Sequence, residues 1–181
     1  MKASWEKIAQ KIRVPVGRLG VITLLFMHPN TESLVIGGAI AGLGALLRIW
    51  AAGYIEKGKA LATAGPYSRT RNPLYLGSLI MGSGVLVAGR IYWFLLPFVI
   101  LYLLLYIPVM KREEQELHQG YGDSFLAYAG RVPMFFPRLS PAEGEPSAFL
   151  WSRVKRNREH RHLLALLIAG IFLIAKSIYW P

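Results

Sequence analysis

The chain has 181 residues, of which 54% are hydrophobic, and a formal net charge of +11 at pH 7. It contains no cysteine, which excludes a disulfide framework, a thiolate nucleophile and a cysteine-ligated metal or haem. A chain that is both apolar and basic is either a membrane protein with basic loops or a nucleic-acid-binding protein. Residues 72–89 and 91–110 carry no charged side chain, and about 20 apolar residues are needed to cross a bilayer. We therefore predict a single-domain, all-α, polytopic helical membrane protein with about five transmembrane helices.

The first two expected spans precede a polar loop. Residues 14–28 form a short span, adequate only if Arg18 snorkels toward the interface, and no cleavage pattern marks a removable signal peptide. Residues 33–52 form the second span. Small residues at helical spacing predict that it contacts another helix closely: Gly37, Gly38, Gly42 and Gly44. Near its end, Arg48 either snorkels, which is the more ordinary interpretation, or faces a polar cavity.

The third and fourth expected spans form a hairpin after the polar loop of residues 53–71. They cover residues 73–89 and 91–110 and are joined by a tight turn at Gly89-Arg90. Antiparallel helices of this kind bring the residue before the first helix and the residue after the second to one membrane face. We therefore expect Arg71 and Glu113 to lie on the same side of the membrane.

The fifth expected span covers residues 163–180, after a Pro/Glu/Ser-rich linker. Of the lysines and arginines near the span ends, Arg90 and Lys176 fall on one side and nearly all others on the opposite side. The positive-inside rule then predicts an integral membrane protein with the N-terminus and long loops in the cytoplasm. The basic residues within 153–161 follow the same rule and can also contact anionic lipid headgroups. No nucleic-acid partner is therefore expected.

The dipeptide Asn72-Pro73 predicts the start of a helix. Proline suits the first helical position, and asparagine is a good N-cap residue. Arg69 and Arg71 lie at the mouth of this helix. Free amides, the positive end of a helix dipole and a guanidinium together favour a carboxylate or phosphate.

Two blocks of residues carry a family resemblance. The first is Gly65-Pro66-Tyr67, Arg71-Asn72-Pro73, Tyr75 and Gly77. The second is Glu113-Glu114, Leu117, Gly122, Tyr128, Val132-Pro133 and Pro137. In this order they resemble the signature of the isoprenylcysteine carboxyl methyltransferase and phospholipid methyltransferase superfamily, Gly-Pro-Tyr-x-x-x-Arg-His-Pro-x-Tyr-x-Gly with its second half, over residues 55–138. The chain departs from the pattern at Asn72, where the family usually has histidine.

The resemblance implies an integral-membrane enzyme that uses S-adenosylmethionine at a cytoplasmic site. The candidate cofactor-binding residues are Tyr67, Arg71, Asn72, Pro73, Tyr75, Glu113 and Glu114, and the candidate catalytic residues are Arg71, Glu113 and Arg131. Tyr67 and Tyr75 are as readily explained by aromatic packing. The expected acceptor is a lipophilic or amphipathic small molecule that enters from the bilayer, and membrane lipid is the other expected partner. The methyl-accepting atom and the oligomeric state do not follow from the sequence.

Glu113 and Glu114 follow the fourth span at what we take to be the end of its helix. Adjacent residues of a helix lie about 100° apart, so one carboxylate can face a cavity while the other binds elsewhere. Two acids at a helix C-terminus oppose the helix dipole, which favours a functional role over a solvated helix end.

Other chemistries are less well supported by the sequence. The four histidines form no metal-binding set, so no metal site is expected, and the serines lack a Gly-x-Ser-x-Gly context. Two alternatives remain: an NADPH-dependent membrane reductase of the sterol reductase type, and a non-catalytic membrane scaffold, which the departure at Asn72 keeps open. Finally, the aromatic segment of residues 120–137 is expected to be either a lid over the cofactor or a structural re-entrant segment.

Overall fold

The computed structural model describes residues 23–56, 58, 60–144 and 146–180. These residues form helices and loops without a strand, which confirms the all-α prediction. The 3-10 helices are η1 (Thr23–Phe26), η2 (Gly65–Ser68) and η3 (Tyr92–Phe94). The α-helices are α2 (Thr31–Ala52), α3 (Pro73–Ala88), α4 (Leu95–Tyr121), α5 (Asp123–Arg131), α6 (Trp151–Arg156) and α7 (His160–Tyr179).

Three helical stretches in the described part of the chain are long and apolar enough to cross a membrane: α2, η3 with α4, and α7. They include the expected span 33–52 completely and the expected spans 91–110 and 163–180 except for Ile91 and Trp180. The expected span 73–89 coincides with α3, which has only 16 residues and is therefore about 24 Å long, less than the hydrocarbon thickness. Most of the expected first span, residues 14–28, lies outside the described residues.

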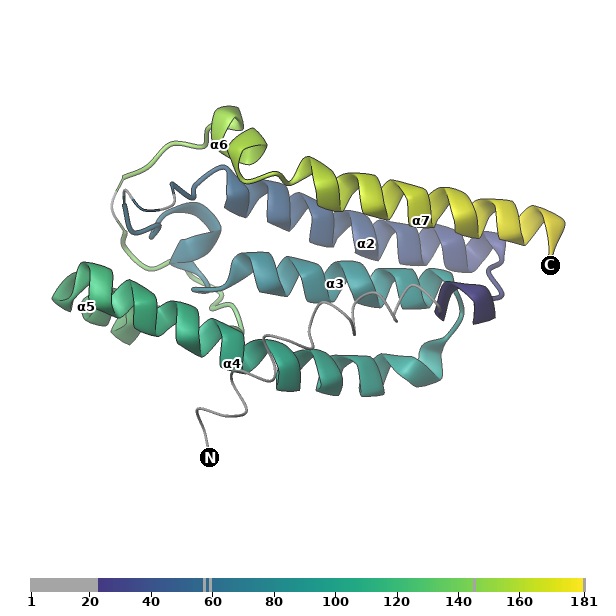
Figure 1. The fold of residues 1–181 in the computed structure, drawn as a ribbon, viewed down its shortest axis with the longest axis horizontal. Helices are drawn as coiled ribbons and strands as arrows, with labels where there is room; N and C mark the ends of the chain where they lie inside the picture. Colours follow the sequence, from purple (N-terminus) through teal and green to yellow (C-terminus); the bar gives the residue numbers. More distant parts are fainter. Residues whose placement is uncertain (1–22, 57, 59, 145, 181) are drawn as a thin grey trace.

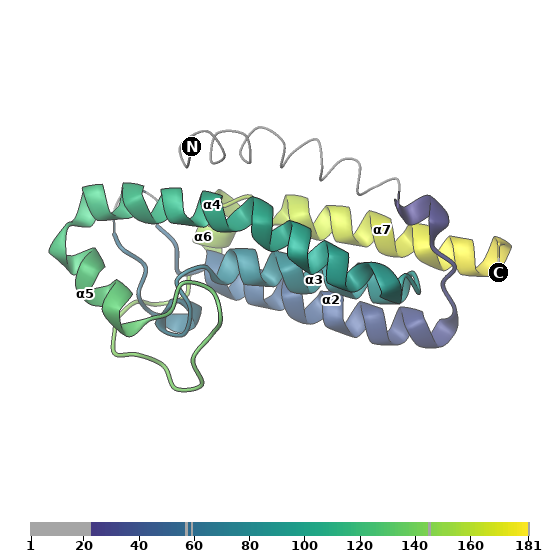
Figure 2. The same ribbon diagram turned by 90° about the horizontal axis from the view of Figure 1, so that it is seen from below.

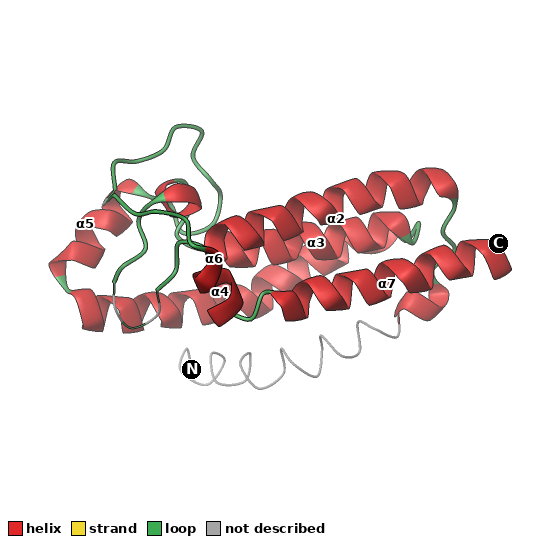
Figure 3. Cartoon of the chain, turned by 90° about the horizontal axis from the view of Figure 1, so that it is seen from above, coloured by secondary structure: helices red, strands yellow, loops and turns green. Residues whose placement is uncertain are grey.

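The four long helices run side by side (Figures 1 and 2). Helices α2 and α3 lie together, with α7 along α2 and α4 along α3. At one end of the bundle α4 continues beyond the start of α3, and α5 folds back from its end (Figure 2). The loops on either side of η2 and the long loop after α5 gather at this same end (Figure 3). The polar loops and the α4 extension therefore meet at one end of the bundle.

Helices α2 and α3 pack so closely that their backbones are in contact, because small residues line the interface. A Cβ added at Gly37 would lie 2.2 Å from the amide nitrogen of Ala88, and one added at Gly44 would lie 2.6 Å from the carbonyl oxygen of Gly77. The small-residue prediction is confirmed for these two glycines. The other two would meet nothing within 4 Å: Gly38 and Gly42. The close contact fixes α3, and with it the loop that precedes α3, against α2.

Candidate functional site

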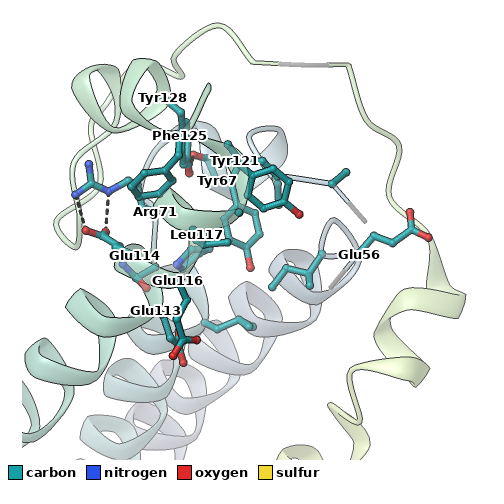
Figure 4. A pocket seen from close by; sticks show the side chains of 18 of the residues that line it. Glu56, Tyr67, Arg71, Glu113, Glu114, Glu116, Leu117, Tyr121, Phe125 and Tyr128 are labelled. Atoms are coloured by element: carbon teal, nitrogen blue, oxygen red, sulfur yellow. Dashed lines mark hydrogen bonds and ion pairs between the residues drawn. The ribbon is translucent and has the colours of Figure 1, made fainter. Parts of the chain in front are cut away.

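A cavity of about 680 Å³ lies at the end of the bundle where α4 extends past α3. Its walls come from the loop after α2, η2, the first turn of α3, the extension of α4, and α5 (Figure 4). All seven residues predicted to bind the cofactor line it: Tyr67, Arg71, Asn72, Pro73, Tyr75, Glu113 and Glu114. The two sequence blocks, separated by a helical hairpin, thus meet at one cavity.

Arg71 is held in a network of hydrogen bonds at this cavity. Its Nε and Nη2 donate to the two carboxylate oxygens of Glu114, at 2.8 and 3.1 Å. Its Nη1 donates to the carbonyl oxygens of Ala129 and Val132, at 2.7 and 3.1 Å. Arg71 therefore ties the start of α3 to α4 and to the C-terminal end of α5, where carbonyl groups lack helical partners.

The two adjacent acids lie inside α4 and not at its end, because the helix runs on to Tyr121. The argument from two acids at a helix C-terminus was therefore wrong. Glu114 pairs with Arg71, whereas Glu113 accepts a hydrogen bond of 2.7 Å from the hydroxyl of Tyr75. As the angle between adjacent helical residues predicted, the two carboxylates have different partners.

Asn72 stands at the N-cap position of α3, and Pro73 begins the helix as predicted. However, the Asn72 side chain makes no capping hydrogen bond. Its Nδ2 donates instead to Glu114 Oε1 at 3.3 Å and to the carbonyl oxygen of Met134 at 3.1 Å. The side-chain cap was wrong because a carboxylate from α4 and a carbonyl from the segment after α5 are within reach.

Tyr67 contributes a polar group that the surrounding protein leaves unpaired. The residue is 6% exposed, and its buried hydroxyl has no hydrogen-bond partner among the described residues. Burial, followed by the neighbouring Tyr128, raises the pKa of Tyr67 well above its ordinary value, so the hydroxyl stays protonated. Because a buried hydroxyl without a partner is destabilising, its position in the cavity wall suits a ligand that offers an acceptor.

The structure does not bring Arg131 into this cavity. Its Nε donates to the carbonyl oxygen of Ala127 in its own helix, and the residue is exposed. It lines a neighbouring cavity of about 870 Å³. The two cavities share the chain around Leu61 and the side chains of Tyr121 and Tyr128.

The aromatic segment of residues 120–137 forms a packed wall. Phe125, Tyr128 and Val132 are buried and pack against Leu61, and the Tyr128 hydroxyl donates to the carbonyl oxygen of Tyr67 at 2.8 Å. The segment covers one side of the cavity, where a lid would lie, and the choice between a lid and a structural re-entrant segment stays a prediction.

The sequence interpretation missed a second ion pair close to the cavity. Arg48 is 7% exposed and Glu159, at the start of α7, is 3% exposed. Their closest charged atoms are 2.9 Å apart, so the prediction that Arg48 snorkels is wrong. An arginine inside the otherwise uncharged span of residues 33–52 was the available signal, since such a residue requires a partner.

The described residues contain no group of three or more His, Cys, Asp or Glu side chains placed to hold a metal ion.

Comparison with known proteins identifies a family and two relatives. The family model for phospholipid methyltransferase matches residues 40–124. The cobalt-zinc-cadmium resistance protein CzcN of Cupriavidus metallidurans is 34% identical over 134 residues, which cover 68% of this chain and 61% of the relative. The nickel-cobalt-cadmium resistance protein NccN of Alcaligenes xylosoxydans xylosoxydans is 33% identical over 131 residues, or 66% and 60%. The chain spans about three fifths of the length of these curated relatives. No solved structure matches the chain.

Proposed function

We propose that the chain, whose residues 40–124 match the family model for phospholipid methyltransferase, belongs to the superfamily of isoprenylcysteine carboxyl and phospholipid methyltransferases and is an S-adenosylmethionine-dependent methyltransferase. Its acceptor is a lipophilic or amphipathic small molecule that reaches the cavity from the membrane. The observation that carries the proposal is the meeting of both sequence blocks at one cavity of about 680 Å³.

The cavity offers the kinds of groups that the cofactor requires. S-adenosylmethionine carries an ammonium, a carboxylate, a ribose and an adenine, and it would supply an electrophilic methyl group on its sulfonium. Glu113, oriented by Tyr75, presents a carboxylate suited to a cationic or hydroxyl group. The first turn of α3 suits a carboxylate, and Leu117 and Phe125 provide apolar wall. The unpaired Tyr67 hydroxyl is a donor available to a bound ligand.

The three candidate catalytic residues take different parts in this proposal. Arg71 is engaged by Glu114 and two carbonyl groups, so we assign it to positioning the cavity walls. Arg131 lies at the neighbouring cavity and is assigned no contact with the cofactor. Glu113 keeps its proposed role at the ligand, and α5 helps to exclude water from the reacting groups.

The charge of the cavity favours this cofactor over NADPH. Four carboxylates are among its lining residues: Glu56, Glu113, Glu114 and Glu116. Three of them are paired with arginines, Glu56 with Arg153, Glu114 with Arg71 and Glu116 with Arg112. Among the described lining residues, Glu113 is therefore the carboxylate without an arginine partner, and Arg71 is already engaged. NADPH brings several phosphate charges that would need free cations, whereas S-adenosylmethionine carries two cationic groups and one carboxylate.

We propose further that the cavity faces the cytoplasm, because the basic residues of the chain concentrate around that end of the spans. The relatives' names concern resistance to metal ions. We propose no metal-binding role for this chain, and its part in such resistance is open to a growth test of a deletion strain.

Isothermal titration of the purified protein in detergent tests the proposal. S-adenosylhomocysteine should bind with one site per chain, and NADPH should not. The Glu113→Gln variant keeps the size of the side chain and removes its charge, so it should bind S-adenosylhomocysteine about ten-fold more weakly. Arg131→Gln is the matched control and should bind normally. Binding of NADPH alone would support the reductase, and binding of neither ligand would support the scaffold.

A further inference from the structure

The ion pair between α2 and α7 reaches the wall of the proposed cofactor cavity. Arg48 Nε and Nη2 donate to the two carboxylate oxygens of Glu159, at 3.0 and 2.9 Å. The remaining terminal nitrogen, Nη1, donates to the carbonyl oxygen of Leu74 at 3.0 Å and to the hydroxyl of Ser78. Leu74 lies in the first turn of α3 and lines the cavity. One guanidinium thus joins α2, α3 and α7.

Two features of the backbone accommodate this pair. A Cβ at Gly77 would lie 2.6 Å from Cγ of Arg48. The absence of a side chain at this position therefore provides the space that the arginine side chain occupies. Before α7, Arg158 has a φ of 57°, a left-handed conformation that is unfavourable for a side-chain-bearing residue. This turn directs the chain from α6 into α7 and places Glu159 against Arg48. Local strain at Arg158 is therefore compensated by the contacts on either side of it.

The pair also acts on Tyr67, whose buried hydroxyl in the cavity wall has no partner among the described residues. Arg48 lowers and Glu159 raises the pKa of Tyr67, after the larger effects of burial and Tyr128. The pair therefore lies close enough to Tyr67 to influence it electrostatically, in addition to its direct bond to Leu74.

Helix α7 has few other means of contacting the cavity walls. Within α7 only Leu173 is buried, and the far end of the helix is attached through Lys176, whose Nζ donates to the carbonyl oxygens of Leu24 and Leu25. The last helix lies along α2 (Figure 1) and outside the residues matched by the family model. The start of α7 is connected to the cavity through Glu159 and Arg48, and the turn before it through Asn157, whose Nδ2 donates to the carbonyl oxygen of the lining residue Ile55 at 3.3 Å.

We propose that Arg48 and Glu159 are positioning residues that hold the first turn of α3 in the geometry required for cofactor binding, so that α7 supports the site. This inference rests on the proposed function. Without the guanidinium, the Leu74 carbonyl loses its cross-helix donor and Glu159 is left as a buried, unpaired charge. The first turn of α3 then becomes mobile at the place where the cofactor carboxylate is proposed to bind.

The test compares Arg48→Met and Glu159→Gln with Lys176→Met, which releases the far end of α7 without touching α3. Hydrogen–deuterium exchange, at a temperature where every variant is folded, should show faster exchange in a peptide covering residues 67–76 for the first two variants. The Lys176→Met variant should exchange at the wild-type rate there. S-adenosylhomocysteine affinity should fall about ten-fold or more for Arg48→Met and remain unchanged for Lys176→Met.

A double variant, Arg48→Met with Glu159→Met, keeps the proposal falsifiable if the single variants fold poorly. Replacing both charges removes the unpaired carboxylate and should restore thermal stability, but cofactor affinity should stay reduced because Leu74 still lacks its donor. Recovery of affinity together with stability would overturn the positioning role, as would unchanged exchange in residues 67–76. If the wild-type protein binds no S-adenosylhomocysteine, the proposed function fails instead, and the exchange experiment still decides whether the pair positions α3.

Discussion

Two of the arginine–glutamate pairs at the cavity end of this protein differ in where they lie and in what else they bind. Arg71–Glu114 lies at the mouth of the cavity, with side chains 15% and 16% exposed. Arg48–Glu159 lies deeper in the helix bundle, with side chains 9% and 4% exposed. Each arginine uses its remaining nitrogen to donate to backbone carbonyls, of α5 and the residue after it in one case and of α3 in the other.

In both pairs the arginine connects helices and loops to one another and is not free to bind a ligand. Both guanidinium groups are occupied by carboxylates and carbonyls. The groups left to meet a ligand are the carboxylate of Glu113 and the hydroxyl of Tyr67. The resulting account separates residues that hold the walls from residues that bind the cofactor, and each of the following variants tests that separation.

The largest effect is expected for Arg48→Met. Removing one partner of a buried ion pair leaves an uncompensated charge and costs about 3–5 kcal/mol. Thermal or denaturant unfolding in detergent should therefore show a marked loss of stability. A loss below about 1 kcal/mol, the usual value for an exposed pair, would mean that Arg48 reaches water and that the two pairs are equivalent.

Arg71→Met should destabilise the protein by less, about 2–3 kcal/mol, because its partners are more exposed and can rehydrate. The contacts of α5 depend on the lost bonds, so limited proteolysis should cut more rapidly near residues 122–132. Arg69→Met is the control, because this neighbouring, half-buried arginine donates to the carbonyl oxygens of Arg138 and Leu139 and not to α5. Equal protease resistance in Arg71→Met and wild type would contradict the bracing role.

Glu113→Gln should change stability by about 0.5 kcal/mol or less, since the amide oxygen can still accept the bond from Tyr75. Its effect should appear in ligand affinity, in contrast to Arg71→Met, which should affect both properties. Unfolding and titration on the same preparation measure the two effects. A Glu113→Gln protein that is unstable but binds the ligand normally would show that Glu113 stabilises the cavity wall and does not bind the ligand.

Tyr67→Phe is the variant expected to lose no stability in the absence of ligand. Removing an unpaired buried hydroxyl should leave stability unchanged or raise it by about 1 kcal/mol. The folded-state pKa of Tyr67 is raised above 10.0, so the unfolded chain ionises first. The stabilisation is therefore complete below pH 10 and is lost as pH rises above 10 toward the folded-state pKa.

Unfolding measurements between pH 8 and 11 should consequently show a smaller alkaline loss of stability for Tyr67→Phe than for wild type. Part of the loss should persist, because burial also raises the pKa of Tyr128. Identical alkaline profiles for the two proteins would mean that the Tyr67 hydroxyl is accessible to water.

The sequence predicted the parts of this structure that depend on local pattern. The apolar runs predicted α2, α3, α4 and α7, and the hairpin of α3 and α4 correctly placed Arg71 and the two acids on one side. Two of the four glycines proposed for helix contact meet α3. The apolar runs and the hairpin concern single elements or elements joined by a short turn, and the glycine prediction depended on the small-residue pattern within α2 alone.

The features that the sequence did not predict depend on contacts between distant segments. Glu159 is 111 residues from Arg48, and no local rule pairs a helix-interior arginine with an acid at the start of the last helix. The Asn72 side chain abandons its expected cap because Glu114 and Met134 come within reach only in the folded chain. The sequence interpretation ended α4 at the two acids, whereas the helix runs on to Tyr121 because the residues that follow are mostly polar residues with high helix propensity.

The most direct test of the account is to map where the cofactor binds. Ultraviolet crosslinking of radiolabelled S-adenosylmethionine to the detergent-purified protein, followed by peptide analysis, identifies the residues in contact with it. The account predicts label in peptides covering residues 60–76 and 113–128, and its loss when excess S-adenosylhomocysteine is present. Label confined to peptides around Arg131 and residues 143–153, which line the neighbouring cavity, would contradict the central claim.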